Sequence, residues 1–86
     1  MKTRVAVVSI ILEKTDSVEV LNSLLSEYRE YIIGRMGIPY RERNVSIICV
    51  ALDAPENAIN SLAGKIGKLD GVSAKINFSN IFSEEE

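Results

Sequence analysis

Two segments of the chain, 5–12 and 45–52, are apolar on both of the faces that a β-strand presents. Ser9 is the only polar residue of the first segment, and Ser46 is the only polar residue of the second. Strands with this pattern are typical of the centre of a sheet, where both faces are covered. The two segments therefore predict a pair of central strands, and they leave the edge positions to other parts of the chain.

Two amphipathic helices are expected, one after each of these strands. Asp16 and Glu19 have the spacing of a capping box, so the first helix is expected to begin there and to run for about four turns. Pro55 at a first helical position predicts the start of the second helix, and Gly71 predicts its left-handed end. The apolar residues at three- and four-residue spacing in the first helix are Val18, Leu21, Leu24, Leu25, Tyr28, Tyr31 and Ile32.

Two glycines lie inside the second helix, at Gly64 and Gly67. Each costs about 1 kcal/mol relative to alanine in a helix interior. Something is therefore expected to approach this surface closely. The sheet beneath a tightly packed helix is one interpretation, and a contact with another subunit is the other.

The remaining strands have the features of sheet edges. Pro39 lacks the amide that a central strand would need, so 33–40 is expected to form an edge strand that ends in a polar turn at 41–44. Segment 72–78 alternates between apolar and polar residues, which is typical of a half-buried edge. Beyond it, a tail with Ile81 and Phe82 leads to three glutamates that are expected to be disordered.

This order of elements predicts an α+β domain of ferredoxin-like βαββαβ type. Right-handed crossovers place the first and third strands in the centre of a four-stranded antiparallel sheet, with both helices on one face. A chain of 86 residues suffices for one core. We therefore expect a single domain over 1–82, followed by an acidic disordered tail at 83–86.

The face of the sheet without helices raises the question of what covers it. The central strands are apolar on that side too, and soluble monomers seldom expose a contiguous apolar patch of this size. We expect a second copy of the chain to cover this face or an edge strand. The alternative is that the tail with Ile81 and Phe82 folds back over part of the sheet.

Composition excludes several classes of function. The net charge of −2 gives no electrostatic reason to expect direct binding of nucleic acid. The longest apolar run is far shorter than the roughly 20 residues that span a bilayer, and no leader peptide is evident, so we expect a cytoplasmic protein without membrane contact. Cys49 is the single cysteine and histidine is absent, which argues against metal sites, iron–sulfur clusters and other cofactors.

The residues also argue against catalysis. Cys49 lies within an apolar strand, where a thiol is more often inert than reactive. The segment 34–42 is the main candidate for a ligand site or a subunit contact, because glycines allow a close approach and arginines bind carboxylates or phosphates. A hairpin with solvated charges is the plainer interpretation. The candidate residues are Arg35, Met36, Gly37, Tyr40 and Arg41, of which Arg35 and Arg41 would hold an anion or the acidic groups of a partner.

Three stretches, IGRMGIPYRE at 33–42, VSII at 45–48 and LAGKIGKLDGV at 62–72, carry a resemblance to a known family. The chain resembles small proteins described as regulators of the iron-only hydrogenase system. The resemblance implies an ACT-like fold, similar to the C-terminal sensor domain of nickel-responsive repressors, which assemble as tetramers.

The chain departs from the nickel sensors in two ways and from amino-acid-binding ACT domains in a third. Met36, Ile38 and Asn44 occupy the stretch in which the nickel sensors have metal-binding side chains, so nickel binding does not carry over. The sequence opens on the first sensor strand, whereas the repressors have a DNA-binding segment before theirs, so we expect any transcriptional role to need a partner. Segment 14–17 lacks the glycine of amino-acid-binding ACT domains.

Together these observations predict a non-catalytic, ligand-sensing regulatory domain that acts as a homo-oligomer, either a dimer or a tetramer. Its expected partners are a regulatory protein or a small anionic ligand. The alternative is a structural subunit that mediates protein–protein assembly and binds no small ligand.

Overall fold

The predicted order of elements is confirmed in the computed structural model, which describes residues 2–83. The strands are β1 (Arg4–Leu12), β2 (Ile32–Tyr40), β3 (Val45–Ala54) and β4 (Val72–Phe82). The helices are α1 (Val18–Glu27) and α2 (Glu56–Gly67), and the short 3-10 turns are η1 (Thr15–Ser17), η2 (Arg29–Tyr31) and η3 (Arg41–Arg43).

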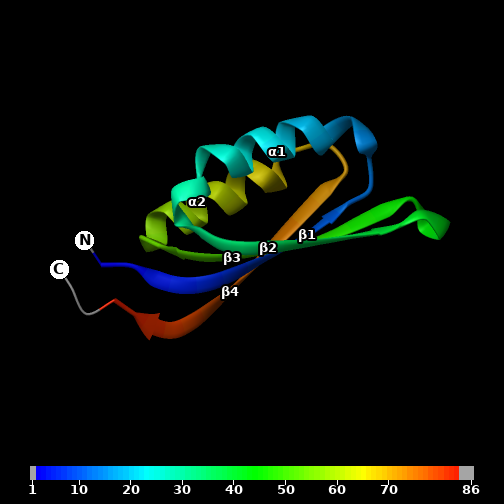
Figure 1. Cartoon of the computed structure of the whole chain (residues 1–86). Coiled ribbons are helices and arrows are strands. Elements are labelled where there is room, and N and C mark those ends of the chain that lie inside the picture. The colour runs from blue at the N-terminus through cyan, green and yellow to red at the C-terminus, as the bar shows by residue number, and fades with distance from the viewer. Residues whose placement is uncertain (1, 84–86) are drawn as a thin grey trace.

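The strands form one antiparallel sheet in the order β2-β3-β1-β4. β1 and β3 lie in the centre, as their two apolar faces predicted, and β2 and β4 form the edges. α1 and α2 cover the same face of the sheet, and within residues 2–83 the other face carries no helix (Figure 1). This is the ferredoxin-like βαββαβ arrangement of an ACT-like domain, so the predicted fold class is confirmed.

The core fills the space between the sheet and the two helices. Along β1 and β3 the even-numbered residues face the helices and are mostly buried, whereas the odd-numbered residues face the other side. Pairing of the two strands sets Val8 opposite Val50 and Ile10 opposite Ile48, so the buried side chains form one layer. The helices complete this core with Leu21, Leu25, Ile59, Leu62 and Ile66.

The predicted capping box at the start of α1 is wrong. Residues 15–17 form η1, and α1 begins one residue later with Ser17 as its N-cap residue, which makes no side-chain capping bond. The Ser17 hydroxyl instead donates a hydrogen bond of 2.7 Å to the main-chain oxygen of Asp70, in the turn that follows α2. A tertiary contact therefore replaces the local cap.

α1 is also shorter than its apolar periodicity predicted. The helix has 10 residues, which is fewer than the 14 or so that four turns require. Tyr31 lies in η2 and Ile32 begins β2, although both still pack against the core. The pattern identified residues that face the core, but not the element that carries them.

β4 extends four residues beyond the predicted end at Phe78. Ile81 and Phe82 belong to this strand and remain exposed, so they do not fold back over the sheet. Ser83 continues the pairing, since its amide donates to the Thr3 oxygen and its hydroxyl accepts from the Thr3 amide, both at 2.9 Å. Residues 84–86 of the predicted tail lie outside the described residues.

The glycines of α2 do not mark a close approach to the sheet. A Cβ atom added at Gly64 or Gly67 would meet nothing within 4 Å in the protomer. Both lie on the exposed side of the helix. Tight packing of α2 on the sheet is therefore not the reason for these two glycines.

Candidate functional site

The five candidate residues lie along β2 and in the turn after it, and the strand directs them to different surfaces. Arg35 and Gly37 pair with buried residues of β3, so both face the helices. Met36 and Tyr40 alternate with them and face the opposite side. Arg41 lies beyond the strand, in η3. The segment therefore contributes to two surfaces and not to one site.

The sheet face opposite the helices, here called the open face, is mostly apolar over β1, β3 and β2, with Ser9 and Asp53 as exposed polar residues of the central strands. Its large exposed side chains are between 41% and 58% accessible to solvent. The part of this face that β4 forms is polar, because Ser73, Lys75 and Asn77 face outward there. The exposed apolar residues of the open face are Ile11, Met36, Ile38, Tyr40 and Ile47.

A groove runs between α1 and β2 on the side of the sheet that the helices cover. Two hollows of about 260 and 230 Å³ form it, and they share Asn22 and Arg35 as lining residues. We call it the α1–β2 groove. Its lining residues are Leu12, Val18, Leu21, Asn22, Leu25, Ser26, Arg29, Ile32, Arg35, Gly37, Ile38, Pro39, Ser46 and Ile48.

Two arginines of this groove are oriented by neutral groups of α1. Arg35 Nη2 donates a hydrogen bond of 3.2 Å to Asn22 Oδ1. Arg29 Nη1 lies 3.4 Å from both the main-chain oxygen and the hydroxyl of Ser26. Neither guanidinium is part of an ion pair with another residue of the range 2–83. Both positive charges are therefore left without a carboxylate partner at the rim of the groove.

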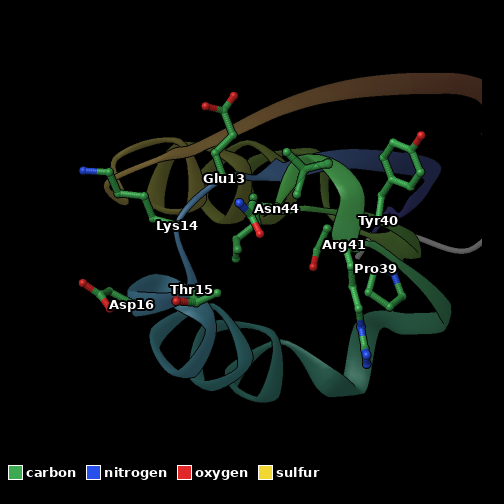
Figure 2. A pocket seen from close by; sticks show the side chains of 11 residues that line it. Glu13, Lys14, Thr15, Asp16, Pro39, Tyr40, Arg41 and Asn44 are labelled. Carbon is green, nitrogen blue, oxygen red and sulfur yellow. The ribbon is translucent and has the colours of Figure 1, made fainter.

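A larger pocket of about 590 Å³, here called the hairpin pocket, lies where β1 leads into η1 and faces the β2–β3 hairpin (Figure 2). It shares Leu12, Pro39 and Ser46 with the α1–β2 groove, so the two hollows are neighbours. The residues that line it are Leu12, Glu13, Lys14, Thr15, Asp16, Pro39, Tyr40, Arg41, Asn44, Val45 and Ser46.

The hairpin pocket has no excess of either charge. Two acidic residues, Glu13 and Asp16, line it together with two basic residues, Lys14 and Arg41. Figure 2 shows Lys14 and Asp16 pointing away from the hollow, whereas Asn44 lies within it. Asn44 adopts the left-handed conformation that closes the hairpin, with φ at 57°.

One wall of the hairpin pocket is fixed by the turn between α2 and β4. The Glu13 amide donates a hydrogen bond of 2.7 Å to the Gly71 oxygen. Ser17 Oγ donates to the Asp70 oxygen at 2.7 Å, and Lys14 Nζ lies 3.1 Å from a carboxylate oxygen of Asp70. These contacts hold the β1–η1 connection against a distant part of the chain, so the pocket wall is preorganised.

Arg35 and Arg41, which were expected to act together, lie in different hollows. Arg35 lines the α1–β2 groove, and Arg41 lines the hairpin pocket. The groove instead pairs Arg35 with Arg29, a residue that the sequence did not single out. Asn22, Ser26 and Arg29 follow each other at spacings of four and three, which is the polar stripe that borders the buried face of α1. That spacing was the sequence signal from which Arg29 could have been identified as a groove residue.

Among residues 2–83 no three potential metal-ligating side chains come together. Cys49 is half-buried on the open face, opposite Met36 of the neighbouring strand. No helix in that range is long and apolar enough to cross a bilayer.

Comparison with known proteins identifies the family. Residues 4–76 match the TM1266-like family, whose description reads "Iron-only hydrogenase system regulator, putative". The chain belongs to this family. No curated protein is similar enough to count as a match.

Solved structures agree with this assignment. The uncharacterized protein TM1266 from Thermotoga maritima is 32% identical, with a TM-score of 0.85 over 91% of this chain and 98% of that one. A formyltetrahydrofolate deformylase from Pseudomonas putida KT2440 has a TM-score of 0.65 at 17% identity, over 90% of this chain and 29% of the deformylase. The second likeness is one of fold alone. The predicted resemblance to the TM1266-like family is therefore confirmed.

Proposed function

We propose that the chain is a non-catalytic regulator of an iron-only hydrogenase system, and that it acts in the cytoplasm as a homo-oligomer, either a dimer or a tetramer. We further propose that it senses a small ligand in the hollows beside β2 and transmits the signal to a partner protein. Membership of the TM1266-like family supports the regulatory role. The observation that carries the oligomer is the apolar surface of the open face.

The open face has the composition of a subunit interface. Ile11 and Ile47 are register partners on the central strands, and each is more than 40% exposed in the protomer. Met36 and Ile38 extend this surface to the edge strand β2. Stable interfaces bury about 800 Å² per partner and have an apolar centre with a polar rim. The polar edge over β4 would form one rim, so a second copy would pack over β1, β3 and β2.

Tyr40 supports a coupling between assembly and ligand binding. This residue belongs to the open face and also lines the hairpin pocket, and its hydroxyl donates a hydrogen bond of 2.9 Å to Glu42. Ile38 likewise belongs to the open face and lines the α1–β2 groove, so a ligand in either hollow would meet a residue that the second copy also contacts. A difference in ligand affinity between two assembly states is what a regulator needs in order to respond.

A genetic test addresses the regulatory role. The gene is deleted in its host, and hydrogenase activity is measured in extracts after complementation with the wild type or with a variant. We expect deletion to change the activity, and we expect Ile47→Glu to fail to restore it, because the charge would prevent self-association. Asn77→Glu is the matched control, since it adds the same charge to the polar edge of the same face, and it should restore the activity. Unchanged activity after deletion would contradict the proposal.

The exposed apolar face also favours the alternative, a structural assembly subunit without a ligand. The two functions differ in whether a small molecule changes the assembly. A regulator requires an oligomer whose stability depends on ligand, whereas an assembly subunit requires one that does not. Thermal unfolding with and without candidate ligands separates them, because a ligand at 100 times its dissociation constant adds about 2.7 kcal/mol.

A further inference from the structure

The α1–β2 groove is electrostatically one-sided, unlike the hairpin pocket. Among the side chains of residues 2–83 that line it, Arg29 and Arg35 are charged and no carboxylate is present. Because Asn22 and Ser26 orient the two guanidiniums through neutral oxygens, neither charge is compensated. Arginine binds carboxylates and phosphates through parallel hydrogen bonds. The charge of the groove therefore favours an anion.

The part of the groove beyond Arg35 is apolar and open to a small group. Leu21 and Ile48 form its buried floor, and Val18 lies at its rim with 37% of its surface exposed. Gly37 leaves space there, because a Cβ atom at this position would meet its nearest neighbour, Ile48 Cγ1, only at 4.0 Å. The two hollows together reach the range of roughly 300–1,000 Å³ that small-molecule pockets occupy.

We propose that the α1–β2 groove binds a small amphipathic anion, with a carboxylate or phosphate head on Arg35 and Arg29 and a short apolar body over Gly37. This proposal rests on the proposed ligand-sensing function and names the chemical class of the ligand and the hollow that takes it. The apolar body replaces water against Leu21 and Ile48, and the head supplies the missing carboxylate partner. The hairpin pocket, whose charges are balanced, suits neither the head nor the apolar body of such a ligand better than the α1–β2 groove does.

Amide chemical-shift titrations of the full chain test this assignment with simple probes. Hexanoate and hexyl phosphate carry both halves of the ligand, hexanol lacks the charge, and inorganic phosphate lacks the apolar body. We expect saturable shifts at Asn22, Arg35, Gly37 and Ile48 with one or both of the amphipathic anions. Hexanol and inorganic phosphate should each bind about tenfold more weakly or worse. The stronger of the two anions identifies the head group.

Paired variants assign the two halves to residues. Arg35→Met should remove the preference for hexanoate over hexanol, whereas Arg43→Met, in an exposed turn outside the groove, should retain it. Gly37→Val should abolish binding by filling the groove, and β-branched residues suit a strand, so the fold is expected to persist. Gly34→Val is the matched control on the other face of the same strand, where a Cβ meets nothing within 4 Å.

Three results would overturn the assignment. Equal binding of hexanoate and hexanol would exclude a role for the arginines. Shifts that map to the hairpin pocket, or no saturable shift with any probe, would exclude the groove as the site. These failures are separate from those of the proposed function, because an oligomer that controls hydrogenase activity in the host would still stand if the groove bound none of the four probes.

Discussion

The guanidinium carbon of Arg4 lies 4.6 Å from the centre of the Phe78 ring, and Phe82 approaches the same group from further along β4 at 4.8 Å. Arg4 Nε also donates a hydrogen bond of 2.6 Å to the main-chain oxygen of Ser79, and the side chain forms an ion pair with Glu56 at the start of α2. One residue at the start of β1 therefore joins the end of β4 to the second helix.

Replacement of this arginine should destabilise the domain. Arg4→Ala removes two cation–π contacts and a hydrogen bond around a largely buried side chain, so we expect a loss of about 2 kcal/mol in urea unfolding. Glu56→Gln removes only the exposed partner of the ion pair and should cost less than about 1 kcal/mol. Equal effects of the two variants would show that the aromatic contacts and the hydrogen bond to Ser79 contribute nothing.

Gly71 and Gly64 should respond to alanine in opposite directions. Gly71 has a φ of 74°, and a Cβ there would lie 2.5 Å from Lys14 Cγ, so Gly71→Ala should destabilise the domain by roughly 1–2 kcal/mol or more. Gly64 lies in the interior of α2 with open space around it, so Gly64→Ala should stabilise it by about 0.5–1 kcal/mol. Denaturant unfolding of both variants checks the signs. A stabilised Gly71→Ala would contradict the left-handed turn.

Ser17 should matter for stability more than its neighbours in the failed capping box. Ser17→Ala removes the hydrogen bond to the Asp70 oxygen from a nearly buried site and should cost about 1–2 kcal/mol. Asp16→Ala and Glu19→Gln should cost little, because Asp16 makes no capping bond to α1. A larger loss of stability for Asp16→Ala and Glu19→Gln than for Ser17→Ala in thermal unfolding would support the predicted capping box instead.

Tyr28 should ionise below the ordinary range of a phenol. The hydrogen bond with Ser61 and, after it, the proximity of Lys65 lower the pKa of Tyr28, and Tyr28 in turn raises the pKa of Lys65. The lowered pKa of Tyr28 stabilises the fold fully at pH values above the pKa that this tyrosine has in the unfolded chain. This stability is lost as the pH falls through the pKa of Tyr28 in the folded chain. The contribution of Lys65 is lost as pH rises through its raised pKa.

Absorbance titration of the phenols checks this coupling. Ser61→Ala should move the tyrosine that ionises first to higher pH, and Lys65→Met should move it in the same direction by a smaller amount. Lys68→Met, outside this contact, should leave the titration unchanged. Titration curves that coincide for all three variants and the wild type would contradict the contact between the two helices.

The fold could be predicted from sequence because its strongest signals are local. Apolar residues on both faces identified the two central strands, and Pro39 identified an edge. The true end of β4 was not predictable in this way, because Arg4 holds that strand from 75 residues away. The predicted start of α1 was wrong for the same reason, since the Ser17 hydroxyl donates a hydrogen bond to the distant residue Asp70 and not to its own helix.

The candidate site was predictable only in part. The glycine and arginine content of 33–42 pointed to β2, but strand alternation divides the five residues between two surfaces. A register shift between Ile32 and Gly34 determines which of them face the helices, and a single sequence does not fix the register that follows such a shift. Arg29 and Asn22 join Arg35 only because the fold sets α1 beside β2.

Sedimentation velocity at micromolar concentration tests the central claim, that a second copy covers the open face, most directly. The wild type and Asn77→Glu should sediment as a dimer or a tetramer, and Ile47→Glu should sediment as a folded monomer. A wild-type chain that sediments as a monomer throughout this range, or an Ile47→Glu variant that assembles as the wild type does, would contradict it.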